Sequence, residues 1–290
     1  MGSRSGWKVV MRVLAVGVLA SGLSFGQVGV QSPAPVNGAG DAGLVAAQRW
    51  VGRALILRGF YAGGELDFDT AGHVKGTPKT TDWTLAGMEL EKVSRKASGE
   101  FLLEGTRVAI SYNQVQHTFD RHPLKDEKLR VVLPGTADGR AVDVEILAVF
   151  SQGIDPALQR SMPGYWSHYF VPSLEWPADE LKGVPILGLN AKIPPDLVMP
   201  VPEKKLEPEY TAEARGARVK GTVQATMVVD PDGVPRRVTI RQPLGYGLDA
   251  RVAETLARYR FHPGTLEGKP VAVEIVFNQG FEFVAVPALR

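Results

Sequence analysis

The chain has 290 residues, with 33 Lys and Arg against 31 Asp and Glu, no Cys, and 44% apolar residues. This length is enough for one or two domains with hydrophobic cores of their own. A net charge of +2 excludes the clustered basic excess that is typical of nucleic-acid-binding proteins. The absence of cysteine excludes disulfides, thiolate metal sites and thiol nucleophiles.

Residues 1–26 have the pattern of a secretory signal peptide. Three cationic residues precede the apolar run 13–25, and small residues at 24 and 26 predict cleavage before Gln27. The run is shorter than the roughly 20 residues that a membrane-spanning helix needs. We therefore expect an exported protein, and the alternative is an uncleaved N-terminal anchor.

Residues 27–45 are rich in Gly, Pro, Ser and Ala and predict a linker. Short strand patterns separated by turn residues follow, and the region 46–182 is predicted to be a β-rich domain closed by helices. The apolar spacing in 141–152 predicts a helix. Asp155 followed by Pro156 predicts the start of another, because Asp caps a helix N-terminus and Pro suits its first position.

Possible metal ligands and acid–base groups occur in this β-rich region. His117, Asp120 and His122 lie within six residues of one another and could share a metal ion. The many charges beside them favour a surface loop between strands instead. Asp67 and Asp69 could act as paired carboxylates, but Asp69 is better explained as the residue that opens a turn. No metal site is predicted.

The sequence carries no motif of catalysis or cofactor binding. Ser151, Ser161 and Ser167 lack the Gly-x-Ser-x-Gly context of a hydrolase nucleophile, and no glycine-rich phosphate loop is present. We expect no enzyme activity and no cofactor. The aromatic residues of segment 165–170 would line one face of a helix, as core or as a protein interface.

The region 183–206 is rich in proline and predicts an extended linker before a C-terminal domain at 207–290. Segment 230–233 (Asp-Pro-Asp-Gly) predicts a hairpin turn. The remaining patterns of this domain predict four elements: a short helix at 211–218, a strand at 222–229, a helix at 248–259 and a final strand at 270–283.

The C-terminal region resembles the C-terminal domain of the TonB family of energy transducers over about residues 207–285. The matching segments are Pro208–Ala214, Val219–Val223, Val229–Gly233, Gly247–Asp249, Tyr259–Pro263 and Gly268–Val271. The resemblance implies an α+β fold, in which a small antiparallel sheet packs on one long helix, preceded here by a separate β-rich domain. It also implies a binding role without catalysis.

In this family the domain pairs an edge strand with a peptide of an outer-membrane transporter. The resemblance therefore implies that the final strand is an open edge, because such an edge offers free main-chain N–H and C=O groups. Its odd-numbered residues would face inward, with Ala272, Glu274 and Val276 outward. Tyr210 and Arg215 would flank this edge. The alternative is a strand already paired in its own sheet or by a dimer partner.

The resemblance leaves three hypotheses for the function. The first is a periplasmic protein that binds a TonB-dependent outer-membrane transporter by strand addition. The second is a true transducer that stays in the inner membrane and contacts a motor complex there, although run 13–25 has no ionisable residue. The third is a scaffold or homodimerisation module, with a ligand-binding N-terminal domain.

Overall fold

A computed structural model describes residues 41–177, 181, 183–189 and 192–282. The described residues belong to one compact unit. The predicted signal peptide and residues 27–40 of the predicted linker lie outside the described residues. Residues 42–45, which were also predicted as linker, instead begin helix α1 (Ala42–Gln48). In the described part of the chain, no helix is long and apolar enough to cross a membrane.

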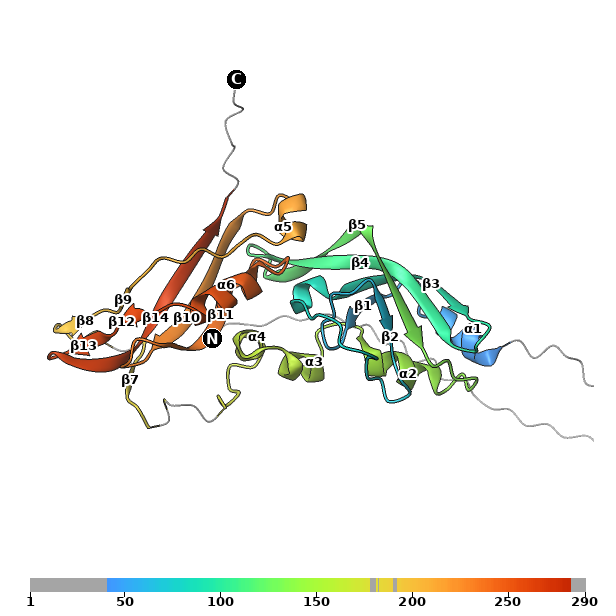
Figure 1. Cartoon of the computed structure of the whole chain (residues 1–290), viewed down its shortest axis with the longest axis horizontal. Coiled ribbons are helices and arrows are strands. Elements are labelled where there is room, and N and C mark those ends of the chain that lie inside the picture. Colours follow the sequence, from blue (N-terminus) through green and yellow to red (C-terminus); the bar gives the residue numbers. More distant parts are fainter. Residues whose placement is uncertain (1–40, 178–180, 182, 190–191, 283–290) are drawn as a thin grey trace, which may run out of the picture. The chain divides into compact units, whose positions relative to one another are not determined.

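The N-terminal region is built around one sheet, whose strands follow the order β2-β5-β4-β3-β1-β6 (Figure 1). Strands β3, β4 and β5 are long and antiparallel, whereas β2 joins β5 in parallel. The elements are α1 (Ala42–Gln48), β1 (Ala54–Leu57), β2 (Glu65–Asp67), η1 (Trp83–Leu85), β3 (Gly87–Arg95), β4 (Phe101–Asn113), β5 (Thr118–Leu133), α2 (Val142–Val149), β6 (Phe150–Ser151), α3 (Pro156–Ser161) and α4 (Gly164–Phe170).

Local sequence explains where several of these elements begin. The Asp155 side chain accepts from the Leu158 N–H at 2.7 Å, and Pro156 occupies the first position of α3, as predicted. Asp69 accepts from the N–H groups of Ala71 and His73 and so opens the predicted turn.

The C-terminal region has a second sheet, with strands in the order β11-β10-β14-β13-β8 and with β7 also paired to β14. A separate small pair joins β9 and β12. The elements are β7 (Ile186–Leu187), β8 (Leu197–Val198), β9 (Val201–Pro202), α5 (Ala212–Gly216), β10 (Gly221–Val229), β11 (Pro235–Gln242), α6 (Leu248–Ala257), β12 (Phe261–His262), β13 (Gly264–Leu266) and β14 (Lys269–Phe281).

The turn between β10 and β11 forms as its sequence predicts. The Gly233 N–H donates to the Asp230 carbonyl at 3.0 Å, and the Asp230 side chain accepts from the Val234 N–H at 2.8 Å. Gly233 has a φ of 78°, and a Cβ there would lie 2.0 Å from the Phe261 carbonyl oxygen. Only glycine fits this turn, both for its backbone conformation and for the close approach of β12.

Helix α6 packs on one face of the C-terminal sheet, against β10 and β11. Its apolar residues Leu248, Val252 and Leu256 are buried, and the inward residues of β10 are buried with them. The helix spans 10 residues, so it is shorter than the single long helix expected. The chain is a mixed α and β protein in which sheets predominate.

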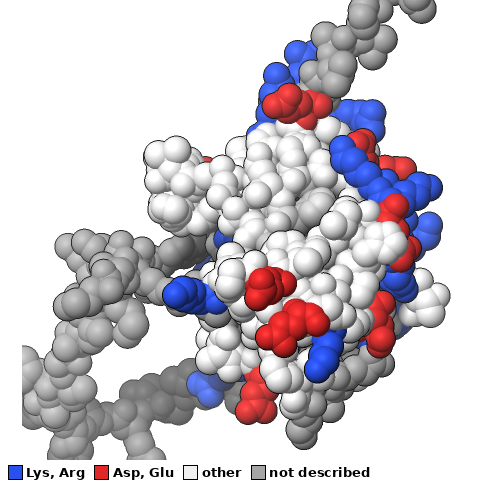
Figure 2. All heavy atoms as spheres, turned by 90° about the vertical axis from the view of Figure 1, so that its left-hand side faces the viewer, with Lys and Arg blue, Asp and Glu red and all other residues white. Residues whose placement is uncertain are grey.

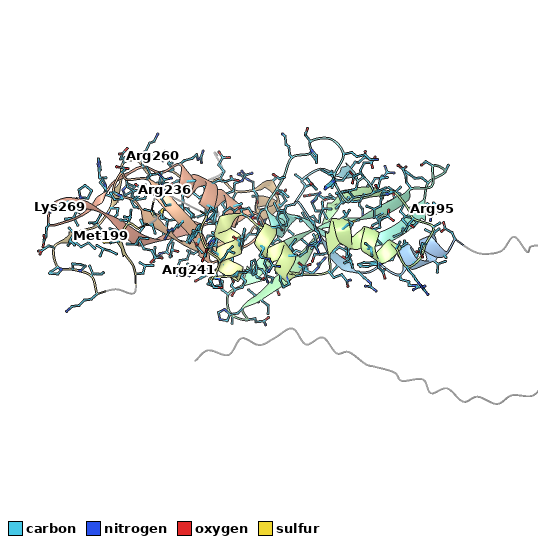
Figure 3. The ribbon with its side chains drawn as sticks, turned by 90° about the horizontal axis from the view of Figure 1, so that it is seen from below. Arg95, Met199, Arg236, Arg241, Arg260 and Lys269 are labelled. Atoms are coloured by element: carbon cyan, nitrogen blue, oxygen red, sulfur yellow. The ribbon has the colours of Figure 1, made fainter. Side chains whose placement is uncertain are left out.

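The opposite face of the same sheet is covered by α4 from the N-terminal region, which packs against β11. Residue His168 of α4 and Thr226 and Thr239 of the sheet line one cavity of about 270 Å³. Because strand residues alternate between faces, these threonines lie on the face away from α6. In Figure 3, Arg241, which lines the same cavity, lies beside α4. The predicted domain boundaries stay a prediction, but the two regions contact each other directly.

The β4–β5 hairpin makes the other contact between the two regions, on the loop before α6. The Tyr246 N–H donates to the Ile110 carbonyl at 2.9 Å, and the Tyr112 N–H donates to the Leu244 carbonyl at 3.1 Å. Beside them, the Gly247 N–H donates to the Thr84 hydroxyl at 2.8 Å. Main-chain hydrogen bonds of this kind fix the loop against the N-terminal sheet.

Candidate partner-binding site

Strand β14 has one paired flank and one flank that is largely open. It pairs with β10 from Val273 opposite Val229 to Phe281 opposite Gly221. On its other flank, β13 pairs with positions 269–271, and β7 pairs only at Ala272 and Val273. Within the described residues, positions 275–281 of β14 have no second strand partner. The main-chain groups that point to this flank are therefore available to an added strand.

A groove of about 720 Å³ runs beside the open part of β14. Its residues come from β14, from the segment 200–207, and from the end of α6 with β12. The lining consists of Pro200, Pro202, Lys205, Glu207, Tyr259, Phe261, Ile275, Phe277, Asn278, Gln279, Gly280 and Glu282. Tyr259 and Phe261 are buried and form its apolar base. The groove thus combines apolar side chains with an open strand flank.

The far wall of this groove, segment 200–207, is held in place by hydrogen bonds. The Glu203 N–H donates to the Arg260 carbonyl at 2.8 Å. The Tyr259 hydroxyl donates to the Leu206 carbonyl at 2.7 Å and accepts from the Leu206 N–H at 3.1 Å. Tyr259 also packs against Phe277 of the β14 wall. Both walls of the groove therefore contact the same residue at the end of α6, which fixes the distance between them.

The sequence family described as Gram-negative bacterial TonB protein C-terminal matches residues 207–283 of this chain. Residues 207–283 are a TonB C-terminal domain. The match includes β10, β11, α6 and all of β14, and therefore the open flank and one wall of the groove. It does not include β7, β8, β9 or the N-terminal region.

The TonB domain is similar to a solution NMR structure of the Pseudomonas aeruginosa TonB CTD. The identity is 24%, and the match covers 34% of this chain and 96% of that chain, with a TM-score of 0.25. No curated protein matches this chain.

The structure places two of the outward residues predicted on β14 as expected and corrects the third. Val276 is exposed, with 43% of its surface accessible. Glu274 is half-buried, and its carboxylate accepts from the Leu189 N–H at 3.3 Å. Ala272 lies on the predicted outward face but is fully buried, so its prediction as a partner-binding residue is wrong. The strand alternates as predicted, but Ile186 and Leu181 cover Ala272.

Tyr210 and Arg215 lie at the C-terminal end of β14. The Tyr210 ring meets the Phe281 ring edge-on, with centroids 5.2 Å apart, and its hydroxyl donates to the Val219 carbonyl at 3.1 Å. The Arg215 guanidinium lies over the Tyr210 ring at 5.9 Å. Both residues therefore lie near the end of the open flank, and neither lines the groove.

The prediction missed the groove residues Ile275, Phe277 and Tyr259. The alternation in β14 assigned Ile275 and Phe277 to the inner face, and both are indeed on it but only partly buried. Phe277 packs edge-on against Tyr259, with ring centroids 5.8 Å apart. One weak signal of this groove is present in the sequence, the proline-rich region 183–206. An extended segment of that region forms the groove wall that faces β14.

The candidate ligands in the N-terminal region have other contacts. His117 bonds the Tyr112 hydroxyl at 3.1 Å, and His122 bonds the Ser111 hydroxyl at 2.8 Å. Among the described residues, no group of three His, Asp or Glu side chains could hold a metal ion. The expectation of a surface loop between strands was wrong for residues 118–128, whereas His117 lies in the turn that precedes them. Residues 118–133 form strand β5, since pairing with β4 overrides a polar sequence.

The aromatic residues of α4 belong to the core. Trp166 is fully buried and meets Trp83 edge-on at 5.3 Å between ring centroids. Its indole N–H donates to the Asp82 carboxylate at 2.8 Å. Phe119 of β5 also packs on this cluster. Of the two roles left open for these aromatic residues, the structure therefore supports the core.

Two buried carboxyl groups lie where the N-terminal region meets the TonB domain. Asp249 accepts from the Leu244 N–H at 2.9 Å and from the Gly245 N–H at 2.7 Å. Burial, together with the charge of the neighbouring Asp82, raises the pKa of Asp249 to about 8. Burial also raises the pKa of Asp82. These groups hold the loop before α6 and lie outside the groove.

The surface around one end of the groove is apolar. Val198, Met199 and Val201, which adjoin the groove wall, are exposed. Figure 2 looks onto this end of the TonB domain, and the face shown is mostly uncharged. Figure 3 places Met199 and Lys269 together at the same end.

Proposed function

We propose that this chain binds an extended segment of an outer-membrane transporter by adding it as a strand to the open flank of β14. The TonB domain implies a part in TonB-dependent transport. Strand addition supplies affinity through main-chain hydrogen bonds, and side-chain pockets beside the strand supply specificity. The role requires neither catalysis nor a cofactor.

The observation that carries this proposal is the asymmetry of β14. Its flank toward β10 is paired over nine residue pairs, from Val273 to Phe281, whereas positions 275–281 have no second strand partner among the described residues. The groove beside these positions supports the same proposal, since every second side chain of an added strand would point into it. The opposite edge strand of the sheet, β11, is packed against α4.

The location of the chain follows from its N-terminus and from the transporter it would bind. We place the chain in the periplasm, after removal of residues 1–26. Retention of these residues would instead anchor it in the inner membrane, within reach of a motor complex. N-terminal sequencing of the protein from fractionated cells decides between the two, because the mature chain then begins at Gln27 or at Met1.

Cross-linking from a single cysteine tests strand addition, and the chain suits it because it has no native cysteine. Val276→Cys carries a photo-cross-linker on the open flank. Val144→Cys, on an exposed residue of α2, is the matched control. Incubated with solubilised outer membranes, the first is expected to form an adduct with the periplasmic segment of a TonB-dependent transporter, identified by mass spectrometry. The control should form none.

Two outcomes would contradict the proposal. Equal adducts from Val276→Cys and Val144→Cys would show that the contact is non-specific. An adduct of Val276→Cys with a second copy of this chain, together with a dimeric mass in solution, would show that the flank joins two copies. That result would favour the scaffold hypothesis.

A further inference from the structure

A short segment of the chain already lies on the flank that a partner strand would use. We name residues 183–189 the strap. Within it, β7 runs parallel to β14, with Ile186 opposite Ala272 and Leu187 opposite Val273 (Figure 1). Just beyond β7, the Leu189 N–H donates to the Glu274 carboxylate at 3.3 Å. The strap thus occupies positions 272–274 of the flank, next to the positions 269–271 that pair with β13.

Apolar packing supports this pairing on the outer face of the sheet. Ala272 and Val228 are buried there, and they form a small cluster with Leu181. Val184 and Ile186 of the strap pack against the same cluster. This cluster is separate from the main core, so the strap can leave without opening the core.

The contact has the properties of a displaceable one. β7 makes only two residue pairs with β14, far fewer than the nine that join β14 to β10. So short a strand adds little stability by itself, and segments with few pairs open locally before the rest of a fold. Two strands cannot bond the same main-chain groups of β14. A partner strand that extends beyond Ile275 toward Ala272 must therefore displace the strap.

We propose that the strap is an internal competitor for the flank of β14: it limits a partner strand to positions 275–281 until it is released. This inference rests on the proposed function, since it concerns the regulation of the same flank.

A reversible lock tests the competition. Ile186→Cys and Ala272→Cys introduce two cysteines at opposed positions of neighbouring strands. Such Cα atoms lie about 4.8 Å apart, within the range of about 4.4–6.8 Å that a disulfide needs. The oxidised double variant holds the strap closed, and the reduced form frees it. Each single variant is a control for the substitution alone.

The released state is obtained with Ile186→Asp, which puts a charge against the apolar cluster. Ile193→Asp is its matched control, because Ile193 is exposed and lies beyond the strap. Successive N–H groups of a strand point to opposite flanks, so one of positions 272 and 273 donates toward β7. Main-chain amide exchange at that position is expected to be at least about tenfold faster in the released variant than in the control. Exchange of the β10 amides that pair with positions 274–281 should stay unchanged, which shows that the sheet is intact.

The binding probe is a labelled synthetic peptide with the sequence of residues 183–189, followed by fluorescence anisotropy. It is expected to bind Ile186→Asp at least about tenfold more tightly than the control variant. The oxidised double variant should not bind it, and reduction should restore binding. Equal affinity of the locked and released forms, or unchanged exchange at 272 and 273, would overturn the inference.

These results also separate the inference from the function on which it rests. If the probe responds to release but Val276→Cys forms no adduct with a transporter, the strap competes for the flank and the proposed partner is wrong. If Val276→Cys forms the transporter adduct but the peptide probe binds the locked and the released chain equally, strand addition holds and the competition is refuted.

Discussion

Gly245→Ala should separate the N-terminal region from the TonB domain. Gly245 has a φ of 92°, and a Cβ at this position would lie 2.2 Å from the Ile110 carbonyl oxygen. That oxygen accepts from the Tyr246 N–H, and the next bond of the contact runs from Tyr112 to Leu244. The extra methyl group therefore forces the β4–β5 hairpin away from the loop that precedes α6.

The size of the effect can be worked out from these contacts. A side chain in the left-handed region costs about 1–2 kcal/mol. Each of the two hydrogen bonds contributes about 0.5–1.5 kcal/mol net. The free energy of unfolding should fall by about 2–5 kcal/mol in total. Gly268→Ala is the matched control, because Gly268 has a φ of 76° and nothing lies within 4 Å of its added Cβ. Gly268→Ala should lose only the unfolding free energy that the left-handed backbone conformation costs, about 1–2 kcal/mol.

Urea denaturation followed by two signals measures the difference. All five tryptophans precede the strap, so their fluorescence reports on the N-terminal region, while circular dichroism reports on both sheets. Gly245→Ala is expected to shift both midpoints more than Gly268→Ala does, and to separate the two transitions. Equal losses in the two variants would refute the role assigned to this contact.

Three further predictions concern charged groups. Burial alone would raise the pKa of Asp155, but hydrogen bonds from a backbone N–H, a serine hydroxyl and Arg58 lower it to about 2. Stability should therefore be lost as the pH falls from about 4 toward 2. Asp155→Asn should reduce this acid-induced fall in melting temperature, and an unchanged fall would contradict the prediction. Asp249 behaves oppositely, because burial raises its pKa to about 8: its contribution is complete below about pH 4 and is lost as the pH rises through 8. Asp249→Asn should make the melting temperature less dependent on pH between about 4 and 8. The same dependence in the variant and the unmodified protein would contradict this prediction. Arg107 is buried and donates to four main-chain carbonyls, so Arg107→Lys should lower the free energy of unfolding by about 2–4 kcal/mol in urea titrations. Arg130→Lys is the control, because Arg130 is exposed, and it should lose little stability. A similar small loss in both variants would show that the carbonyl contacts matter little.

Local turn and cap chemistry made much of the TonB domain predictable. The turn at 230–233, the helix that starts at Leu248 and the final strand are all close to their predicted places. In the turn, neighbouring residues favour the backbone conformation, and in the helix and the strand the spacing of apolar residues indicates the element. The family match covers the same residues.

Features that depend on distant contacts could not be predicted from the sequence. The alternation in β14 gave the correct face for Ala272, but not its cover, because β7 is a two-residue strand inside a proline-rich segment with no apolar period. The polar segment 118–128 looks like a loop, and only its pairing with β4 makes it a strand. The cover of the sheet by α4 has no sequence signal either, since it joins segments about 70 residues apart.

The helix and the strap that cover the outer face of the TonB sheet lie upstream of residue 207. A fragment cut at the boundary of the family match would lack both, and would present Val228 and Ala272 bare to water. Such a fragment would tend to self-associate through that face, and its binding edge would extend further than in the intact protein. Partner affinities measured on the isolated piece would then describe a surface that α4 and the closed strap cover in the intact protein.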